Sequence, residues 1–588
     1  VALRFDLNAK TAEGRAKLQL HPYAYPADSL ALDAKNLKLD EKVQYDGPGA
    51  LKHQAVRGDS IILYFDRALR PKDTIGLTFR YTATPYHEER GGGAAIRDRR
   101  GLYFINTDGK VAGKPSQIWT QGETEANSHW VPTIDRPNSR SSFRIALTVA
   151  DSFRTLSNGA LVESRVEGNM RTDIWEIKER IPVYTAMFAI GKFAVITDEW
   201  QGREVSYYVE PEFAPYARLM FRNTPEMMDF FSQVTGVPYP WNKYSQVVVR
   251  DYVSGAMENT SASLFGEFMN QNARELMDDG YEFIVAHELF HQWFGDYVTA
   301  ESWSHLTLNE SFANYGEYLW WRYKYGTAAA DEYHFNDLAK YLGSTEYGDP
   351  ELVRFHYHDH DDMFDRVSYQ KGGRILYYLH QLTGDSAFFR AMQLYLTRHA
   401  LRPAEAADWR LAVEEATGLD WNWFFNQWYY RGGHPVLDVQ YQYDDAAQRL
   451  NVTLTQQQSG DFVYRLPLKT AVIYGDAPEI VDWDIRNRKH TFSYPYKNGQ
   501  KPVLTPDITH CLPGEIHESK LPAEWLTQYT VCGDYFSKRR ALAQVYGQFN
   551  DSSAKALFRL ALKDTMASIR IYALNRLKEQ KKGREEWQ

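Results

Sequence analysis

The sequence has few cysteines, no long apolar run and no excess of positive charge. Only Cys511 and Cys532 occur, which is too few for a disulfide framework; the two could pair or remain buried thiols. No stretch approaches the roughly 20 consecutive apolar residues that a membrane-spanning helix needs, so we expect no membrane span. The formal net charge of -9 argues against broad binding to phosphate backbones. We therefore expect no nucleic-acid partner.

The composition is typical of a folded protein with several domains. Apolar residues make up 44% of the 588 residues and charged residues 24%, which fits an ordinary globular chain, and a chain of this length usually divides into several cores. Strand-like alternation fills the first part of the sequence, as at residues 144–149. Helical apolar spacing begins near Tyr216, strand patterns return at residues 436–507, and helical spacing follows Pro522.

These changes of pattern predict a multidomain α+β fold. We place an N-terminal β-domain at residues 1–197, a helix-rich domain at 198–432, a small β-rich domain at 433–516 and a short helical domain at 517–588. The last segment is spaced like stacked helix pairs, and two or three helices rarely bury a core alone. They would either dock on the preceding domain or continue into further repeats.

The chemistry is concentrated at residues 285–296, VAHELFHQWFGD. His287 and His291 lie four residues apart in a helical segment, so both imidazoles project from one face. Glu310 lies in a second helical segment, with eighteen residues between it and His291. Two imidazoles and a carboxylate leave one position of a tetrahedral zinc ion open, which is typical of a catalytic site. We predict one zinc ion per chain, with Glu288 as the general base.

These histidines and a second polar segment also have other interpretations. His287 and His291 could be ordinary core or surface histidines of a helix. The polar segment HYHDHDD at residues 356–362 could form a second metal site, although polar runs of this kind are usually solvated loops. No second cluster at a matching spacing accompanies it, so we expect a loop.

Further motifs extend the pattern over most of the chain. GAMEN at residues 255–259 precedes HELFH, and LNE follows it; TQGE lies at 120–123, SYQKGG at 368–373 and RGGHPVL at 431–437. Taken together, these motifs resemble those of the M1 family of zinc aminopeptidases. The implied fold is an N-terminal β-domain, a thermolysin-like catalytic domain, a small β-sandwich and a C-terminal HEAT-like helical domain. The order agrees with the pattern along the chain.

The resemblance implies an enzyme that hydrolyses the N-terminal peptide bond of peptides. His287, His291 and Glu310 would bind zinc, Glu288 would be the base, and Tyr369 would donate its hydroxyl to the oxyanion. The free amino terminus would bind to carboxylates, because an ammonium that enters a closed cleft must offset its desolvation. The implied substrate-binding residues are Gln121, Glu123, Gly255, Ala256, Met257, Glu258 and Asn259.

The chain departs from the family pattern at three positions that are not predicted ligands. Thr307 and Ser311 stand where members often carry Trp and Gly, and Gln370 replaces a frequent Glu. Local packing would differ there, without a change in the catalytic set. The spacing alone gives no reason to prefer Tyr369 to Tyr377 or Tyr378.

Two other functions are alternatives to an aminopeptidase. An epoxide hydrolase branch of the family uses the same zinc but carries GGMEN in place of GAMEN. A peptide-binding protein with an inactive site would be expected to have lost Glu288, which is present. We expect a monomer. Because the chain begins with Val1 rather than Met, we favour a periplasmic or secreted location, with a cytoplasmic one as the alternative.

Overall fold

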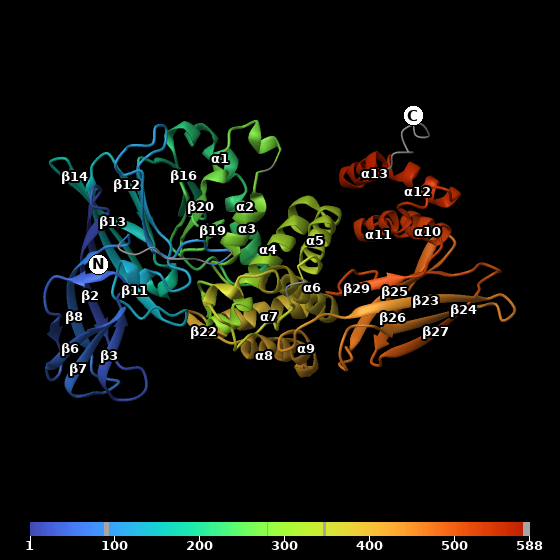
Figure 1. The fold of residues 1–588 in the computed structure, drawn as a ribbon, viewed down its shortest axis with the longest axis horizontal. Coiled ribbons are helices and arrows are strands. Elements are labelled where there is room, and N and C mark those ends of the chain that lie inside the picture. Colours follow the sequence, from blue (N-terminus) through green and yellow to red (C-terminus); the bar gives the residue numbers. More distant parts are fainter. Residues whose placement is uncertain (87–92, 94, 279, 345–347, 580–588) are drawn as a thin grey trace. The chain divides into compact units, whose positions relative to one another are not determined.

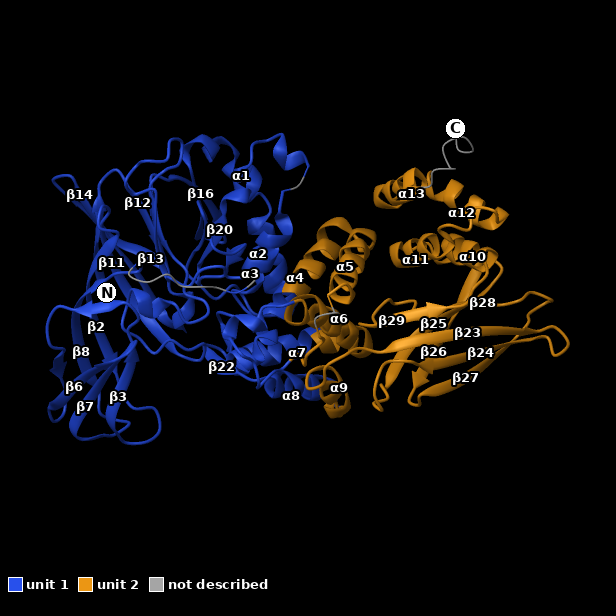
Figure 2. Ribbon diagram, viewed as in Figure 1, with its two compact units in different colours: residues 1–313, 353–365, 389–418 blue, residues 314–352, 366–388, 419–588 orange. Residues whose placement is uncertain are grey.

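The computed structural model describes residues 1–86, 93, 95–278, 280–344 and 348–579. They pack into two compact units (Figure 2). The first unit comprises residues 1–313, 353–365 and 389–418, and the second comprises residues 314–352, 366–388 and the chain from 419 onward. Each unit can hold more than one domain, so the four domain boundaries given above remain predictions.

The first unit begins with a β-rich region of three sheets (Figure 1). The largest sheet has the order β13-β14-β11-β1-β2-β8-β4, with β5 also paired to β8. Alternate residues of β8 are buried, because successive side chains of a strand point to opposite faces. The strands are β1 (Ala2–Asp6), β2 (Thr11–Leu20), β3 (Ala27–Asp33), β4 (Leu37–Leu39), β5 (Gln44–Asp46), β6 (Leu51–Arg57), β7 (Ser60–Leu69), β8 (Ile75–Ala83), β9 (Leu102–Ile105), β10 (Gln117–Thr120), β11 (Arg140–Ala150), β12 (Arg154–Ser157), β13 (Ala160–Glu167), β14 (Met170–Pro182) and β15 (Phe188–Gly191).

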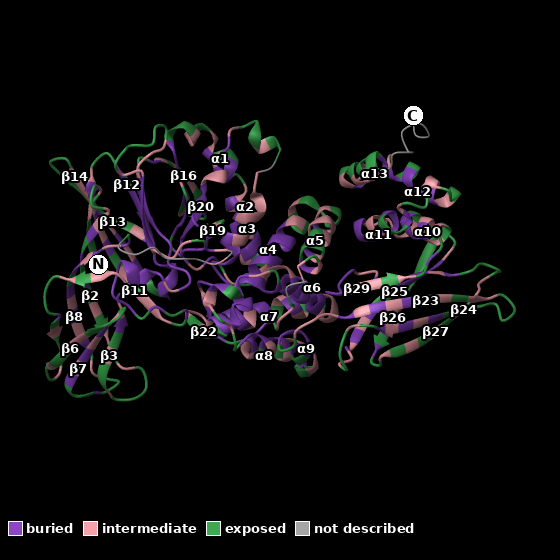
Figure 3. Ribbon diagram, viewed as in Figure 1, coloured by how far each residue is buried: buried purple, intermediate pink, exposed green. Residues whose placement is uncertain are grey.

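A mixed five-stranded sheet and its helices follow in the same unit. Its order is β16-β17-β18-β20-β19, so β19 is an edge strand. Every residue of β18 and β20 is buried, as expected for strands covered on both faces, and Figure 3 shows buried residues along β20 and in α3. The elements are β16 (Ala194–Trp200), β17 (Arg203–Val209), α1 (Ala217–Met220), α2 (Thr224–Thr235), β18 (Tyr244–Val249), β19 (Ala256–Met257), β20 (Ala262–Gly266), α3 (Glu282–Phe290) and β21 (Val298–Ala300).

The next part of the chain is mainly helical. Helix α4 continues from the first unit into the second, because the division falls after Ala313. A π-helix at Val367–Lys371 leads directly into α6. The elements are α4 (Thr307–Tyr325), α5 (Thr327–Leu342), α6 (Gly372–Thr383), α7 (Asp385–Arg398), β22 (Arg402–Ala404), α8 (Ala406–Thr417) and α9 (Asn422–Trp428).

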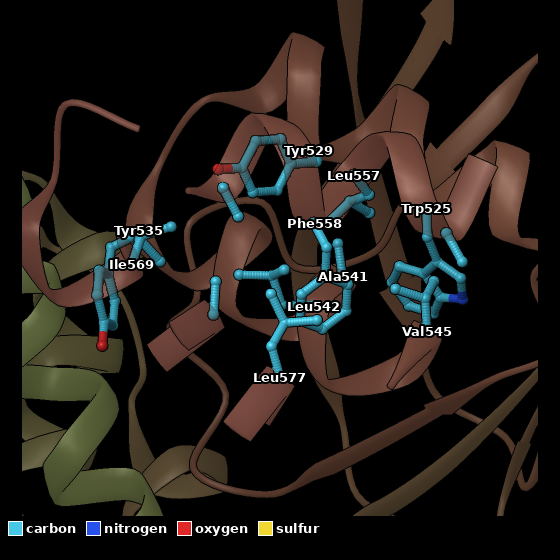
Figure 4. Close-up of a cluster of buried hydrophobic side chains, with 13 residues drawn as sticks. Trp525, Tyr529, Tyr535, Ala541, Leu542, Val545, Leu557, Phe558, Ile569 and Leu577 are labelled. Atoms are coloured by element: carbon cyan, nitrogen blue, oxygen red, sulfur yellow. The ribbon is translucent and has the colours of Figure 1, made fainter. Parts of the chain in front are cut away.

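The second unit continues with two small sheets and four helices. The sheets have the orders β27-β24-β23-β29 and β26-β25-β28. Helices α10 to α13 bury a shared apolar core that includes Trp525, Leu557 and Ile569 (Figure 4), and Phe335 of α5 packs against it. The elements are β23 (Val436–Asp444), β24 (Arg449–Gln456), β25 (Leu466–Tyr474), β26 (Ala477–Ile485), β27 (Lys489–Pro495), β28 (Val503–Thr505), β29 (Glu515–Glu518), α10 (Pro522–Cys532), α11 (Tyr535–Val545), α12 (Ser552–Ala561) and α13 (Ala567–Glu579).

Two expectations about the whole chain can be compared with these elements. No helix among the described residues is long and apolar enough to cross a membrane. Cys511 and Cys532 are both free thiols, so the open question of their pairing is answered in favour of separate thiols.

Candidate functional site

Three potential metal ligands meet where α3 approaches the first turn of α4. His287 and His291 lie one helical turn apart, and their Nε2 atoms are 3.1 Å from each other. Oε2 of Glu310 lies 3.3 Å from Nε2 of His287 and 3.5 Å from Nε2 of His291. His291 and Glu310 are buried, and His287 is largely so. The predicted trio therefore converges on one point inside the first unit.

The spacing of these three atoms suits a tetrahedral zinc ion. Ligand bonds of about 2.0–2.2 Å place the corners of a tetrahedron about 3.3–3.6 Å apart, close to the three distances between the ligand atoms. Nδ1 of His291 donates to the carbonyl of Phe294 over 2.9 Å. This bond fixes the neutral tautomer whose Nε2 lone pair points toward the trio. Two histidines and one carboxylate are also a donor set that zinc prefers.

Glu288 is buried beside the first histidine of the trio. Burial raises the pKa of its carboxyl to about 8, while the imidazoles of His287 and His291 act to lower it. Its Oε2 accepts no hydrogen bond from the described residues. A divalent cation at the trio would lower the pKa further by its charge. Oε2 of Glu288 can therefore accept a proton next to the metal ligands.

A second cluster consists of carboxylates only and shares Glu310 with the first. One oxygen from each of Glu123, Glu258 and Glu310 lies within 4.8 Å of the other two, and all three residues are buried. Burial, together with the neighbouring carboxylates, raises the pKa of Glu123 well above its usual value, and burial also raises the pKa of Glu258. Buried carboxylates so close together favour a cation between them.

Other residues hold the members of this second cluster in place. The hydroxyl of Tyr184 donates to Oε1 of Glu258 over 3.1 Å. The hydroxyl of Tyr252 donates to Oε1 of Gln121, whose Nε2 lies 3.2 Å from Sδ of Met257. Gln121 thus contacts the GAMEN segment through Met257. Tyr184 and Tyr252 were not predicted, because nothing in the sequence separates them from the other 38 of its 40 tyrosines.

The GAMEN segment forms the edge of the five-stranded sheet. Ala256 and Met257 make up β19, which pairs only with β20 in the described sheet. Gly255 is exposed, and a Cβ added to it would meet no described heavy atom within 4 Å. Asn259 is fully buried, and neither polar atom of its side chain has a hydrogen-bond partner among the described residues. The space beside Gly255 is therefore open, and one edge of β19 is unpaired in the described sheet.

Gln292 links the metal-binding segment to the GAMEN segment. Its Nε2 donates to the carbonyl of Glu258 over 2.8 Å, and its Oε1 accepts from the backbone N–H of Ser261 over 2.8 Å. Gln292 follows His291 directly, just after α3. Its buried side-chain amide therefore links the end of this helix to the backbone of Glu258. No role was predicted for Gln292 from the sequence, although its place next to His291 was a signal.

The segment at residues 356–362 does not form a second metal site. Asp359 and Asp361 both bind the guanidinium of Arg99, at 2.7 and 2.6 Å. Thr124, next to Glu123, contacts Asp361 over 3.3 Å. Within the described ranges, neither metal-ligating group includes this segment. Arg99 neutralises the carboxylates of Asp359 and Asp361. The polar segment can therefore pack against Thr124, next to Glu123.

Two remaining sets of predicted positions can be located. Thr307 and Ser311 are buried in the first turns of α4, where their hydroxyls share a hydrogen bond of 2.7 Å. The two departures from the family pattern thus contact each other. Tyr369 lies half-buried in the π-helix of the second unit, a type of turn that is frequent at functional sites. Its role at the metal ligands stays a prediction.

Comparison with known proteins finds two family matches along the chain. The Peptidase M1 N-terminal domain matches residues 1–185, and the Peptidase family M1 domain matches residues 219–428, which contain GAMEN, both histidines and Glu310. Aminopeptidase M1 of Arabidopsis thaliana is 27% identical over 59% of this chain and 41% of its own length. Aminopeptidase M1-D of Oryza sativa subsp. japonica is 25% identical over 79% of this chain and 53% of its own length. Probable aminopeptidase 1 of Sulfurisphaera tokodaii is 24% identical over 79% of this chain and 56% of its own length.

The chain spans about half the length of the curated relatives it matches. The matched regions nevertheless include both the N-terminal β-rich region and the segment that carries the metal ligands. The chain belongs to peptidase family M1.

Proposed function

We propose that this chain is a zinc-dependent aminopeptidase that removes residues from the N-termini of peptides. The main support is that Glu310 belongs to both clusters. One of its oxygens lies within 3.5 Å of both histidine Nε2 atoms, and an oxygen of Glu310 lies within 4.8 Å of oxygens of Glu123 and Glu258. A metal site and a cation-binding site that share a residue hold the substrate's ammonium close to the reacting bond. The names of the relatives support an aminopeptidase.

One zinc ion would be held by His287, His291 and Glu310. When bound, zinc supplies a Lewis acid that polarises a carbonyl and makes a water molecule more acidic. The tautomer of His291 is already set by its hydrogen bond to Phe294, so its Nε2 is ready to ligate without rearrangement.

Glu288 would act as the general base and then as the general acid. Its carboxylate accepts a proton from the water that attacks the carbonyl carbon of the first peptide bond. It then gives this proton to the leaving amine as the C–N bond breaks. The unpartnered Oε2 of Glu288 supports this role, because a carboxylate oxygen already occupied by protein donors would be a weaker base.

Glu123, Glu258 and Gln121 would bind the free amino terminus. Ionised Glu123 and Glu258 attract the ammonium, and Oε1 of Gln121 can accept from it. The edge strand β19 would pair with the substrate backbone through Gly255 and Ala256. Met257 contacts Gln121, and Asn259, two residues after the strand, is fully buried. A peptide with a free amino terminus would satisfy the carboxylates and the edge strand together.

Tyr369 would donate its hydroxyl to the oxyanion that forms on the attacked carbonyl. The family pattern of SYQKGG supports this assignment, and the π-helix supplies a rare backbone geometry that can aim a side chain. Tyr377 and Tyr378 are less suitable, because their hydroxyls donate to the carbonyls of Thr509 and Pro467.

The proposal is tested by following a peptide with a free amino terminus by mass spectrometry. We expect successive loss of single N-terminal residues, which stops when 1,10-phenanthroline removes the metal and resumes when Zn²⁺ is restored. Cleavage at internal bonds, or cleavage that the chelator does not affect, would contradict the proposal.

A further inference from the structure

We propose that Glu123, Glu258 and Glu310 form a second divalent-cation site, distinct from the zinc site, which a bound cation and the ammonium of a substrate occupy in turn. The inference that a bound cation excludes the substrate's ammonium from this site rests on the proposed function. The inference that the site binds a cation does not. The ligand is a divalent cation that prefers oxygen, since every donor in this cluster is a carboxylate oxygen.

The geometry of the cluster fits such a cation. Two oxygens bound to the same cation at 2.3–2.6 Å lie at most about 4.6–5.2 Å apart. One oxygen from each of Glu123, Glu258 and Glu310 lies within 4.8 Å of the other two. Each pair of these oxygens is therefore close enough to share one ion.

One buried oxygen in this cluster also lacks a partner. Oε1 of Glu123 accepts no hydrogen bond from any described residue, although the side chain is only 6% exposed. A buried carboxylate oxygen without a donor is costly. It is expected to bind a cation whenever one is available.

The charges of the region lead to the same conclusion. Four buried glutamates lie together, namely Glu123, Glu258, Glu288 and Glu310. If all four are ionised, one divalent cation at the histidine trio offsets only two of their negative charges. A substrate ammonium offsets a third, whereas a second divalent cation offsets both that remain. The cation therefore competes with the ammonium for the same carboxylates.

The site can be measured by titrating the zinc-loaded chain with Mn²⁺ alone and recording the paramagnetic resonance signal of free Mn²⁺. Manganese prefers oxygen ligands and binds N/O sites more weakly than zinc, so zinc remains at the histidines. We expect one Mn²⁺ per chain. Glu123→Gln and Glu258→Gln should each weaken this binding at least tenfold, while Glu167→Gln, which removes an exposed carboxylate of the same unit, should not.

Zinc counted by atomic emission shows whether each variant keeps an intact first site. An amino-acid amide with a free amine should displace Mn²⁺, and its N-acetylated twin should not. Absence of Mn²⁺ binding, or binding that neither Glu123→Gln nor Glu258→Gln weakens, would overturn the second site. Binding that depends on both glutamates but ignores the free amine would overturn the exclusion, and with it the assignment of these residues to the substrate's amino terminus.

Discussion

Glu288 is the residue at which metal binding and proton transfer can be separated. It lies beside His287 but is not one of the three converging ligands. Glu288→Gln should therefore keep one zinc ion per chain, while kcat falls roughly 10³-fold or more because the base is lost. Zinc content and kcat are measured on the same sample.

Glu282→Gln provides a matched control, since it makes the same substitution at the start of the same helix. It should leave kcat close to that of the parent chain. A Glu288→Gln chain with normal kcat, or one that loses its zinc, would show that its assigned role is wrong.

Lys243 shows how burial at a single residue affects stability. Its Nζ donates to the carbonyl of Ser261 over 3.0 Å, and burial lowers its pKa to about 7. In the unfolded chain its pKa is about 10.4, so the unfolded state binds more protons between pH 7 and 10. The free energy of unfolding should therefore rise with pH across this window, by up to roughly 1.4 kcal/mol per pH unit from this residue.

Lys243→Met removes the titrating group while keeping much of the apolar stem. Urea unfolding at pH 7, 8 and 9 should show a weaker rise in stability for this variant than for the parent chain. Equal slopes would mean that Lys243 remains protonated in the folded state or is not buried in solution.

Single residues also show what the sequence could and could not predict about the site. The spacing of His287 and His291 follows from helix periodicity, so their convergence was predictable. The hydrogen bonds of Gln292 to Glu258 and Ser261 join segments more than thirty residues apart. Contacts of this kind depend on how the elements pack, which periodicity does not determine. Tyr184 was hidden for the same reason.

At the scale of elements, the π-helix before α6 carries Tyr369, the proposed oxyanion donor. Tyr369→Phe should keep the zinc ion, while kcat falls by about 10²–10³-fold through loss of an oxyanion donor. The chain offers Tyr378→Phe as a control, because its hydroxyl donates to the carbonyl of Pro467 within the second unit. That variant should lose some stability but no catalytic rate.

Steady-state kinetics of the two variants shows whether Tyr369 or Tyr378 is the oxyanion donor. If Tyr369→Phe has normal kcat, or if Tyr378→Phe has the larger loss, the resemblance has assigned the oxyanion donor to the wrong residue.

The polar segment at residues 356–362 shows why composition alone misleads at the element scale. Its aspartates suggested metal binding as an alternative, yet Asp359 and Asp361 pair with Arg99, which lies about 260 residues earlier. The sequence contains nothing that links these positions. The expected solvated loop was also incomplete, since Asp361 is buried and contacts Thr124 next to Glu123.

At the scale of the whole molecule, the sequence predicted the coarse order of β-rich and helical regions, but strands β18 to β20 lie inside the region where helical spacing was expected. Strands fill the chain up to β17, helices dominate from α4 to α9, and sheets and then four helices follow. The division into two packed units could not be predicted, because it falls inside the continuous helix α4. Packing between distant segments, rather than the local pattern, sets that division.

The central claim is that this chain acts on the free amino terminus of peptides. The most direct measurement compares kcat/KM for a peptide and its N-acetylated twin, in the parent chain and in Glu123→Gln. We expect the parent chain to cleave the free peptide far better, because the acetylated twin leaves buried carboxylates unpaired, and we expect Glu123→Gln to reduce this preference by at least tenfold. Cleavage of both peptides at similar rates by the parent chain would contradict the claim.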